Sequence, residues 1–108
     1  MVTEVDVWRL SAAIADGAIV LDVREPHEYV AGHVPGARLV PLSTVSKAVD
    51  ELPTGRPIYV ICQGGNRSLV AAQELTRCGR DARSVVGGTS RWISAGHPVV
   101  RGARENRA

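Results

Sequence analysis

Cys62 is the residue whose surroundings in the sequence most favour chemistry. It follows the apolar run of an expected strand and precedes a short loop that leads into an expected helix. Unpaired N–H groups in such a loop and in the first helical turn stabilise negative charge, so the pKa of this thiol should fall below about 8.5. Two glycines let the loop amides point toward one centre, and an arginine adds a planar cation suited to oxyanions. The loop residues are Gln63, Gly64, Gly65, Asn66, Arg67 and Ser68.

This combination predicts a nucleophilic thiolate inside an anion-binding loop. Its substrate should be a small oxyanion, or a molecule with a soft electrophilic atom beside one. Most cysteines at the end of a buried strand are inert apolar side chains, and a glycine-rich turn after one is ordinary. The glycine pair, Arg67 and the start of a helix together favour the nucleophile over that simpler interpretation.

Alternating strands and helices are expected to position the loop. Strands are expected at residues 18–23, 37–40, 57–61 and 84–86. Helices are expected at 7–16, from Pro26 to Gly32, at 44–51, at 68–78 and after Thr89. Asp6, Ser43 and Thr89 suit the N-caps of three of these helices.

This alternation through short loops predicts one α/β domain over residues 1–100, with a parallel sheet covered by helices on both faces. Ligands of such sheets bind at the carboxyl ends of the strands, which is where Cys62 is expected. Residues 101–108 contain three arginines and one glutamate, and we expect them to form a flexible basic C-terminal tail.

Charge and composition exclude several classes of function. Without residues 101–108 the chain has ten basic and ten acidic residues, so nothing suggests the basic face of a nucleic-acid-binding protein. No apolar run approaches the ~18 residues of a membrane span, and the N-terminal residues lack the pattern of a signal peptide. The expectation is a cytoplasmic protein that does not bind a membrane. The three histidines and two cysteines are scattered, which argues against a structural metal site.

Three segments resemble the rhodanese-like sulfurtransferase family in order and spacing. The loop from Cys62 to Ser68 is similar to the family's Cys-x-x-Gly-x-Arg-Ser active-site loop. The other two segments resemble the family's upstream and C-terminal signatures. They are Leu21–Tyr29 with Gly32–Ala37, and Gly87–Trp92 with Gly96–Val99. The resemblance extends from about residue 3 to residue 100 and implies a five-stranded parallel sheet between helices.

The resemblance also implies a reaction of the thiosulfate sulfurtransferase (rhodanese) type. Cys62 would take a sulfane sulfur from thiosulfate or a related donor and carry it as a covalent persulfide. It would then pass the sulfur to cyanide or a thiol, without a metal or an organic cofactor. The amides of Gln63 to Arg67 would hold the persulfide, and Arg67 would contact the anionic end of the donor.

Four further residues receive structural roles. Asp22 and Arg24 match the upstream signature and are expected to brace the loops around the site, because a carboxylate at the end of a buried strand needs partners. His33, before a Val-Pro-Gly turn, is expected to make turn hydrogen bonds. Cys78 would lie ~15 Å along its helix from the loop. We therefore expect Cys78 to be a core residue that does not react with a persulfide on Cys62.

Two other functions compete with this interpretation. Cysteine phosphatases and arsenate reductases use a similar thiolate and arginine, but typically with five residues between them, whereas this loop has four. The alternative within the family is a persulfide relay or regulatory rhodanese-like domain, in which a partner protein donates or accepts the sulfur.

Overall fold

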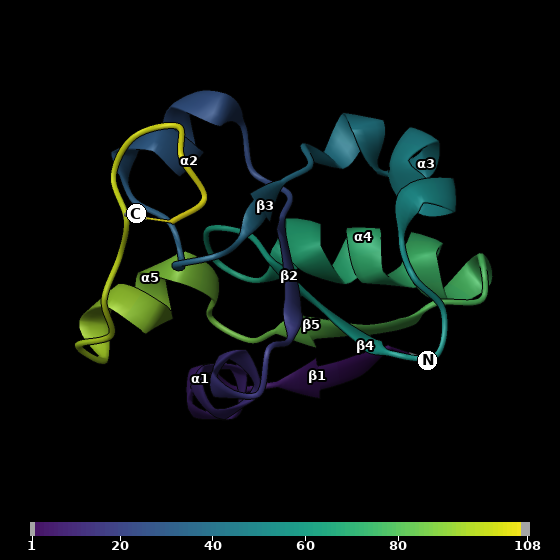
Figure 1. Cartoon of the computed structure of the whole chain (residues 1–108), viewed down its shortest axis with the longest axis horizontal. Coiled ribbons are helices and arrows are strands. Elements are labelled where there is room, and N and C mark those ends of the chain that lie inside the picture. Colours follow the sequence, from purple (N-terminus) through teal and green to yellow (C-terminus); the bar gives the residue numbers. More distant parts are fainter. Residues whose placement is uncertain (1, 107–108) are drawn as a thin grey trace.

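A computed structural model describes residues 2–106 of the 108-residue chain and contains one five-stranded sheet. The strands are β1 (Thr3–Val5), β2 (Ile19–Asp22), β3 (Arg38–Leu39), β4 (Pro57–Ile61) and β5 (Asp81–Val85). They lie in the order β1-β5-β4-β2-β3, and every neighbouring pair is parallel (Figure 1). All five strands therefore end at the same edge of the sheet, where β4 leads into Cys62.

Helices cover both faces of the sheet, as the sequence predicts. The helices are α1 (Val7–Ala15), α2 (Pro26–Ala31), α3 (Val45–Ala48), α4 (Asn66–Arg77) and α5 (Gly88–Ser94), with short 3-10 helices at Leu42–Thr44 and Val49–Glu51. One core packs α3 and α4 against the sheet, and the other packs α1, α2 and α5 against the opposite face. None of the helices within residues 2–106 has both the length and the apolar character needed to cross a bilayer.

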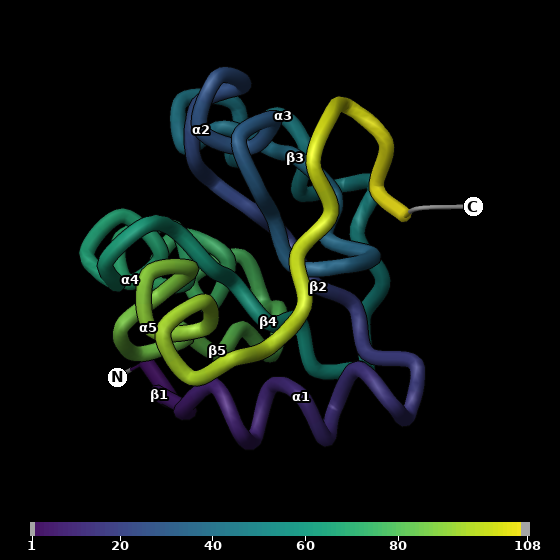
Figure 2. The backbone as a smooth tube through the Cα atoms, turned by 90° about the vertical axis from the view of Figure 1, so that its left-hand side faces the viewer, coloured from purple at the N-terminus to yellow at the C-terminus, as the bar shows by residue number. Residues whose placement is uncertain are grey.

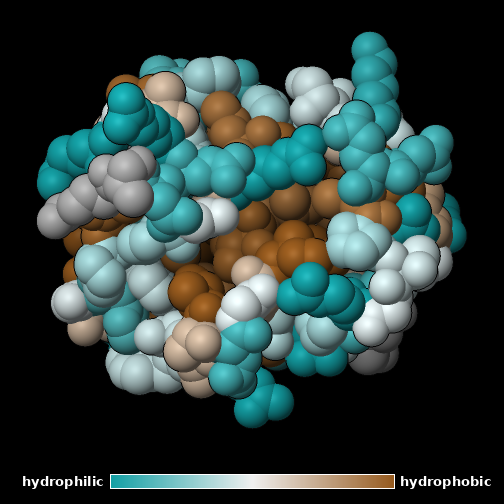
Figure 3. All heavy atoms as spheres, viewed as in Figure 1, coloured by the Kyte–Doolittle hydropathy of each residue, from teal (hydrophilic) through white to brown (hydrophobic). Residues whose placement is uncertain are grey.

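The central strand β4 shows why its sequence is apolar without interruption. Ile58 and Val60 point into the core under α4, whereas Tyr59 and Ile61 point into the core under α1 and α5. A strand that is buried on both faces needs apolar residues at every position. Some apolar residues also reach the surface: Figure 3 shows hydrophobic atoms across the middle of one face, surrounded by hydrophilic ones.

The two edge strands are short. β1 has three residues, of which Thr3 and Glu4 are exposed, and β3 has two, of which Arg38 is exposed. Residue patterns alone did not indicate β1, and the fifth strand was implied only by the family resemblance. The five-stranded parallel sheet flanked by helices on both faces is confirmed.

Several expected element boundaries are wrong, and two of them share one reason. α4 begins at Asn66 rather than at residue 68, and α5 begins at Gly88 rather than after a Thr89 cap. In both cases a glycine with positive φ starts the helix, and no side chain caps it. Ser43 lies inside a 3-10 helix and does not cap α3. β5 begins at Asp81, three residues earlier than expected.

Cys78 is exposed, so the expectation of a core residue is wrong. α4 ends at Arg77, and Cys78 is the C-cap residue, with non-helical backbone angles. Its side chain therefore no longer follows the buried stripe of the helix. Its Sγ lies 3.6 Å from a carboxylate oxygen of Glu74.

The C-terminal segment is hydrogen-bonded to the domain through the part that the structure describes. The Gly102 N–H donates to the carbonyl of Val30 at 2.8 Å, and Nε2 of His33 lies 2.7 Å from the carbonyl oxygen of Arg104. Figure 2 shows this segment running from α5 past β2 and β3, and Figure 1 shows it beside α2, where Val30 accepts the hydrogen bond from Gly102. Hydrogen bonds thus connect Gly102, Arg104 and Glu105 of the expected tail to the domain, while Arg107 and Ala108 lie outside the described residues.

Candidate active site

Cys62 lies immediately after β4 and is only 1% exposed. The N–H of Gly65 donates to its Sγ at 3.0 Å, and the hydroxyl oxygen of Ser68 lies 3.4 Å from the same sulfur. The loop therefore curls around the sulfur and brings the first turn of α4 against it. A φ of +109° at Gly65 makes this curl available to glycine rather than to other residues.

The electrostatics of the loop favour the thiolate. Burial raises the pKa of Cys62. Hydrogen bonds from the Ser68 hydroxyl and from the amides of Ser68, Gly65 and Gly64 lower this pKa, and together they outweigh the effect of burial. The net pKa of Cys62 is below its ordinary value. This is the direction that the sequence predicts for a thiol at a helix N-terminus, and it increases the thiolate fraction at neutral pH.

The start of α5 is hydrogen-bonded to the backbone of the loop. The N–H and the hydroxyl of Thr89 both donate to the carbonyl of Cys62, at 2.8 and 3.0 Å. The N–H of Ser90 donates to the carbonyl of Gln63 at 3.1 Å. A Cβ atom on Gly88 would lie 2.5 Å from the Cys62 carbonyl oxygen, so this close contact requires glycine.

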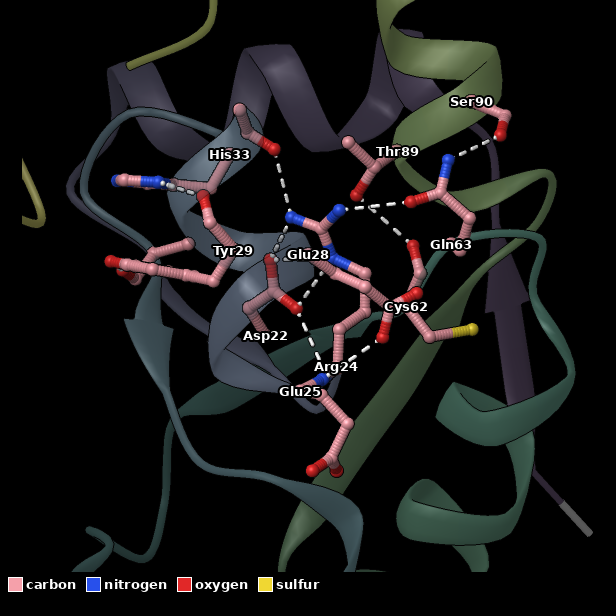
Figure 4. Close-up of polar contacts among 12 residues, drawn as sticks. Asp22, Arg24, Glu25, Glu28, Tyr29, His33, Cys62, Gln63, Thr89 and Ser90 are labelled. Carbon is pink, nitrogen blue, oxygen red and sulfur yellow. Dashed lines mark hydrogen bonds and ion pairs between the residues drawn. The ribbon is translucent and has the colours of Figure 1, made fainter. Parts of the chain in front are cut away.

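Asp22 and Arg24 form a buried ion pair beside the loop, with the Arg24 side chain 2% exposed. The Asp22 carboxylate accepts from Nε and Nη2 of Arg24, the latter at 2.8 Å. Nη1 of Arg24 donates to Oε1 of Gln63 at 2.9 Å, and Nη2 also donates to the carbonyl of Gly32. Figure 4 shows the Arg24 guanidinium between the carboxylate and the Gln63 side chain.

Both polar atoms of the Gln63 side-chain amide are consequently hydrogen-bonded. Its Oε1 accepts from Arg24, and its Nε2 donates to the hydroxyl of Ser90 at 2.7 Å (Figure 4). The side chain thereby ties the β2 end of the site to α5. The pair of Asp22 and Arg24 is thereby linked to the loop through Gln63, and the hydrogen bonds given for its side chains do not include the sulfur of Cys62.

Arg67 pairs with Glu28 from α2. Nη1 and Nη2 of Arg67 donate to the two carboxylate oxygens at 2.7 and 2.8 Å, and the side chains are 36% and 21% exposed, respectively. The hydrogen bond from Arg67 lowers the pKa of Glu28 to about 2 against the opposing effect of burial, and the pairing raises the pKa of Arg67. The expected contact for an anionic donor is thus already engaged by a carboxylate.

The structure brings together most of the predicted site residues and adds others. Gly64 and Asn66 lie on the exposed side of the loop, and Ser68 is buried beneath Cys62. The sequence analysis did not place Glu28, Ser84, Gly88, Thr89 and Ser90 in the site. The helix after Thr89 was expected, but not its place in the site; the glycine pair Gly87 and Gly88, which allows close backbone contact after the strand next to β4, is a sequence signal that could have indicated it.

Comparisons with known proteins agree with this geometry. Residues 7–95 match the rhodanese-like domain family. The chain is 31% identical over 103 residues to a sulfurtransferase of Allochromatium vinosum, covering 93% of this chain and 96% of that protein. It is 37% identical over 78 residues to the thiosulfate sulfurtransferase GlpE of Pseudomonas putida, covering 71% of each protein.

Two further matches extend the comparison. The chain is 41% identical over 76 residues to the uncharacterized protein YqhL of Bacillus subtilis, covering 69% of this chain and 60% of YqhL. The crystal structure of a rhodanese-related protein from Thermoplasma volcanium has a TM-score of 0.85 at 34% identity, covering 91% of this chain and 97% of that one. Sequence, fold and loop geometry agree, and the chain belongs to the rhodanese-like domain family.

Proposed function

We propose that this protein is a sulfurtransferase that moves a sulfane sulfur from thiosulfate or a similar donor to a thiophilic acceptor, cyanide or a thiol, through a persulfide on Cys62. The position of the Cys62 sulfur carries the proposal. The sulfur lies 3.0 Å from the Gly65 amide at the start of α4, where hydrogen bonds lower the pKa of the thiol despite its burial. Sulfurtransferases among the relatives support the same reaction class.

In the first half-reaction the Cys62 thiolate attacks the outer sulfur of thiosulfate. A bond forms between Sγ and that sulfur as the S–S bond of thiosulfate breaks, and the electron pair leaves with sulfite. Cys62 then carries a persulfide anion, which the loop amides from Gln63 to Arg67 are proposed to hold; among them, those of Gly64 and Gly65 already hydrogen-bond to the sulfur of Cys62.

In the second half-reaction the acceptor attacks the terminal sulfur of the persulfide. The bond between this sulfur and Sγ breaks, and its electron pair returns to Cys62 as the thiolate. Cyanide becomes thiocyanate, and a thiolate becomes a persulfide. Electrons and atoms balance within these two displacements, so the proposed route needs no metal or organic cofactor.

Arg67 remains the proposed contact for the anionic end of the donor. The pair with Glu28 uses one N–H on each terminal nitrogen, which leaves three of the five guanidinium N–H groups for other acceptors. The side chain keeps 36% of its surface exposed, so an anion in solvent can reach it. Glu28 then sets the orientation of the guanidinium before the donor binds.

The experiment that tests the proposal is the intact mass of the reduced protein before and after exposure to thiosulfate. We expect a gain of one sulfur atom that cyanide removes. Cys62→Ser should abolish the gain, whereas Cys78→Ser, which replaces the exposed thiol, should retain it. A gain that persists in Cys62→Ser would refute the assigned nucleophile.

A persulfide relay fed by a partner protein is the second candidate. The Glu28 carboxylate beside Arg67 favours it, because this negative charge opposes the approach of a free dianion such as thiosulfate. A relay would show no sulfur gain from thiosulfate but would gain one from a protein that carries a persulfide. The same mass measurement, made with both donors, separates the two candidates.

A further inference from the structure

Ser84 is a buried hydroxyl in β5, paired with Val60 of β4, which belongs to the core under α4. Its side chain is 1% exposed, and its Oγ lies 2.8 Å from the Oγ of Ser68. Within residues 2–106 this is the hydrogen-bond contact that the structure gives to the Ser84 hydroxyl. The alternate residue on the same face of the strand, Ala82, belongs to the apolar core. A polar side chain at such a position therefore needs an explanation beyond packing.

Proton accounting fixes the direction of this hydrogen bond. Each serine hydroxyl has one proton to donate and two lone pairs that accept. If Ser68 donated to Ser84, the buried proton of Ser84 would have no acceptor, which is costly. Ser84 therefore donates to Ser68, and the single proton of Ser68 is free for one of its other two neighbours.

Which of these two neighbours accepts the Ser68 proton depends on whether Cys62 is a thiol or a thiolate. The Ser68 oxygen is 3.1 Å from the carbonyl of Gly65 and 3.4 Å from the sulfur of Cys62. When Cys62 is a thiol, its S–H donates to Ser68, and Ser68 donates to the Gly65 carbonyl. When Cys62 is a thiolate, the Ser68 proton turns to the sulfur, and the thiol no longer donates to Ser68.

We propose that Ser84 is a positioning residue for the Cys62 nucleophile, which acts by holding the Ser68 hydroxyl ready to donate to the thiolate. In the thiol form Ser68 accepts from two donors, Ser84 and Cys62. In the thiolate form it accepts from Ser84 alone. Loss of the Ser84 hydroxyl consequently leaves the Ser68 oxygen without any donor only in the thiolate form, so the loss is more costly there. Donation from Ser84 also polarises Ser68 and strengthens its bond to the sulfur.

The charged side chains around the loop interact with residues other than Ser84 and Ser68. Arg67 pairs with Glu28 on one side, and Arg24 pairs with Asp22 on the other. From α5, Arg91 lies over the ring of Trp8, with its guanidinium carbon 5.0 Å from the ring centre. Replacing Ser84, which contacts none of these groups, leaves their charges in place. A change in the ionisation of Cys62 can then be assigned to the hydroxyl pair.

The test is the pH dependence of Cys62 alkylation by iodoacetamide, in a Cys78→Ser background that leaves a single thiol. We expect Ser84→Ala to raise the pKa of Cys62 by about 0.5 to 1, the effect of losing one neutral hydrogen bond in one protonation state. Alkylation well below that pKa should slow about three- to tenfold. Ser84→Thr, which keeps the hydroxyl, should retain the original profile, and Ser94→Ala, which removes an exposed hydroxyl, should not change it.

The decisive measurement repeats Ser84→Ala in a Ser68→Ala background. Since Ser84 acts through Ser68, its removal should there leave the pKa of Cys62 unchanged, a non-additivity that a general loss of packing would not produce. An unchanged pKa in Ser84→Ala, or an equal rise in both backgrounds, would overturn the proposal. Ser84→Val, which has the shape of the Ser84→Thr variant but lacks the hydroxyl, provides the same comparison should the alanine variant not fold.

The inference rests on the proposed role of Cys62 as the nucleophile. Alkylation needs no sulfur donor, so its outcome is separate from that of the thiosulfate experiment. A shifted pKa without sulfur gain would support the role of Ser84 and contradict thiosulfate as the donor. Sulfur gain without the shift would support the proposed function and contradict the role of Ser84.

Discussion

Gly88→Ala is the substitution whose consequence the structure defines most sharply. The new Cβ would lie 2.5 Å from the carbonyl oxygen of Cys62 and 2.6 Å from that of Gln63. Ordinary contact begins near 3.4 Å, so α5 and the loop must separate by about 0.9 Å. Both partners are backbone atoms, which cannot turn away as a flexible side chain would. The hydrogen bonds from Thr89 and Ser90 to these carbonyls are therefore expected to lengthen.

The magnitude follows from two separable contributions. Alanine in a left-handed conformation costs about 1 kcal/mol, because Gly88 has a φ of +59°. Forcing a methyl group into a close-packed contact adds about 1 to 3 kcal/mol. We expect the free energy of unfolding to fall by roughly 2 to 4 kcal/mol in total.

Gly79→Ala is the matched control. Gly79 has a φ of +83°, but a Cβ there would meet no atom within 4 Å, so only the conformational cost of about 1 kcal/mol applies. Urea denaturation of both variants measures the difference, and alkylation of Cys62 reports whether the loop has moved. Equal losses of stability in the two variants would show that α5 and the loop are not in the tight contact described above.

The ion pairs and the C-terminal segment give further expectations. Asp22→Asn leaves Arg24 buried without a counter-charge, and urea denaturation should show a loss of about 3 kcal/mol; a loss below about 1 kcal/mol would contradict the burial of the pair. The lowered pKa of Glu28, about 2, means that its pair with Arg67 stabilises the fold above about pH 4.5 and that this contribution disappears as the pH falls toward 2. Exposure limits the contribution to about 1 kcal/mol, and Glu28→Gln should flatten the stability profile between those pH values. Ending the chain after Gly102 removes the carbonyl partners of Nε2 of His33 and should lower the melting temperature by several degrees; an unchanged melting temperature would mean that the segment does not stabilise the domain.

The parts of the fold that local patterns specify could be predicted from the sequence. Asp6 accepts a hydrogen bond from the N–H of Arg9 at 2.8 Å, and α1 spans nearly the predicted residues. The apolar run of β4 and the loop after it are also where the sequence places them. These features depend on residues that are neighbours in the chain.

The features that were missed depend on residues far apart in the chain. β1 is held by pairing with β5, some eighty residues later, and its three residues carry too weak a pattern to indicate a strand alone. The pair of Glu28 and Arg67 spans 39 residues, and that of Ser68 and Ser84 spans 16. The helix predicted to begin at Ser68 begins two residues earlier, at Asn66, and the local pattern did not show that Ser68 would point inward to Cys62 and Ser84.

The short edge strands have a consequence for how copies of this protein meet. An edge strand exposes unpaired N–H and C=O groups that another chain can extend into a continuous sheet, the usual route to strand-mediated aggregation. Here one edge offers three residues with a charged glutamate at their centre, and the other offers two, whose exposed arginine pairs with Glu51 at 3.1 Å. Neither edge provides a long flat template. The folded protein should therefore resist edge-to-edge extension of its sheet as its concentration rises, even though two of the three inner strands, β2 and β4, are largely apolar.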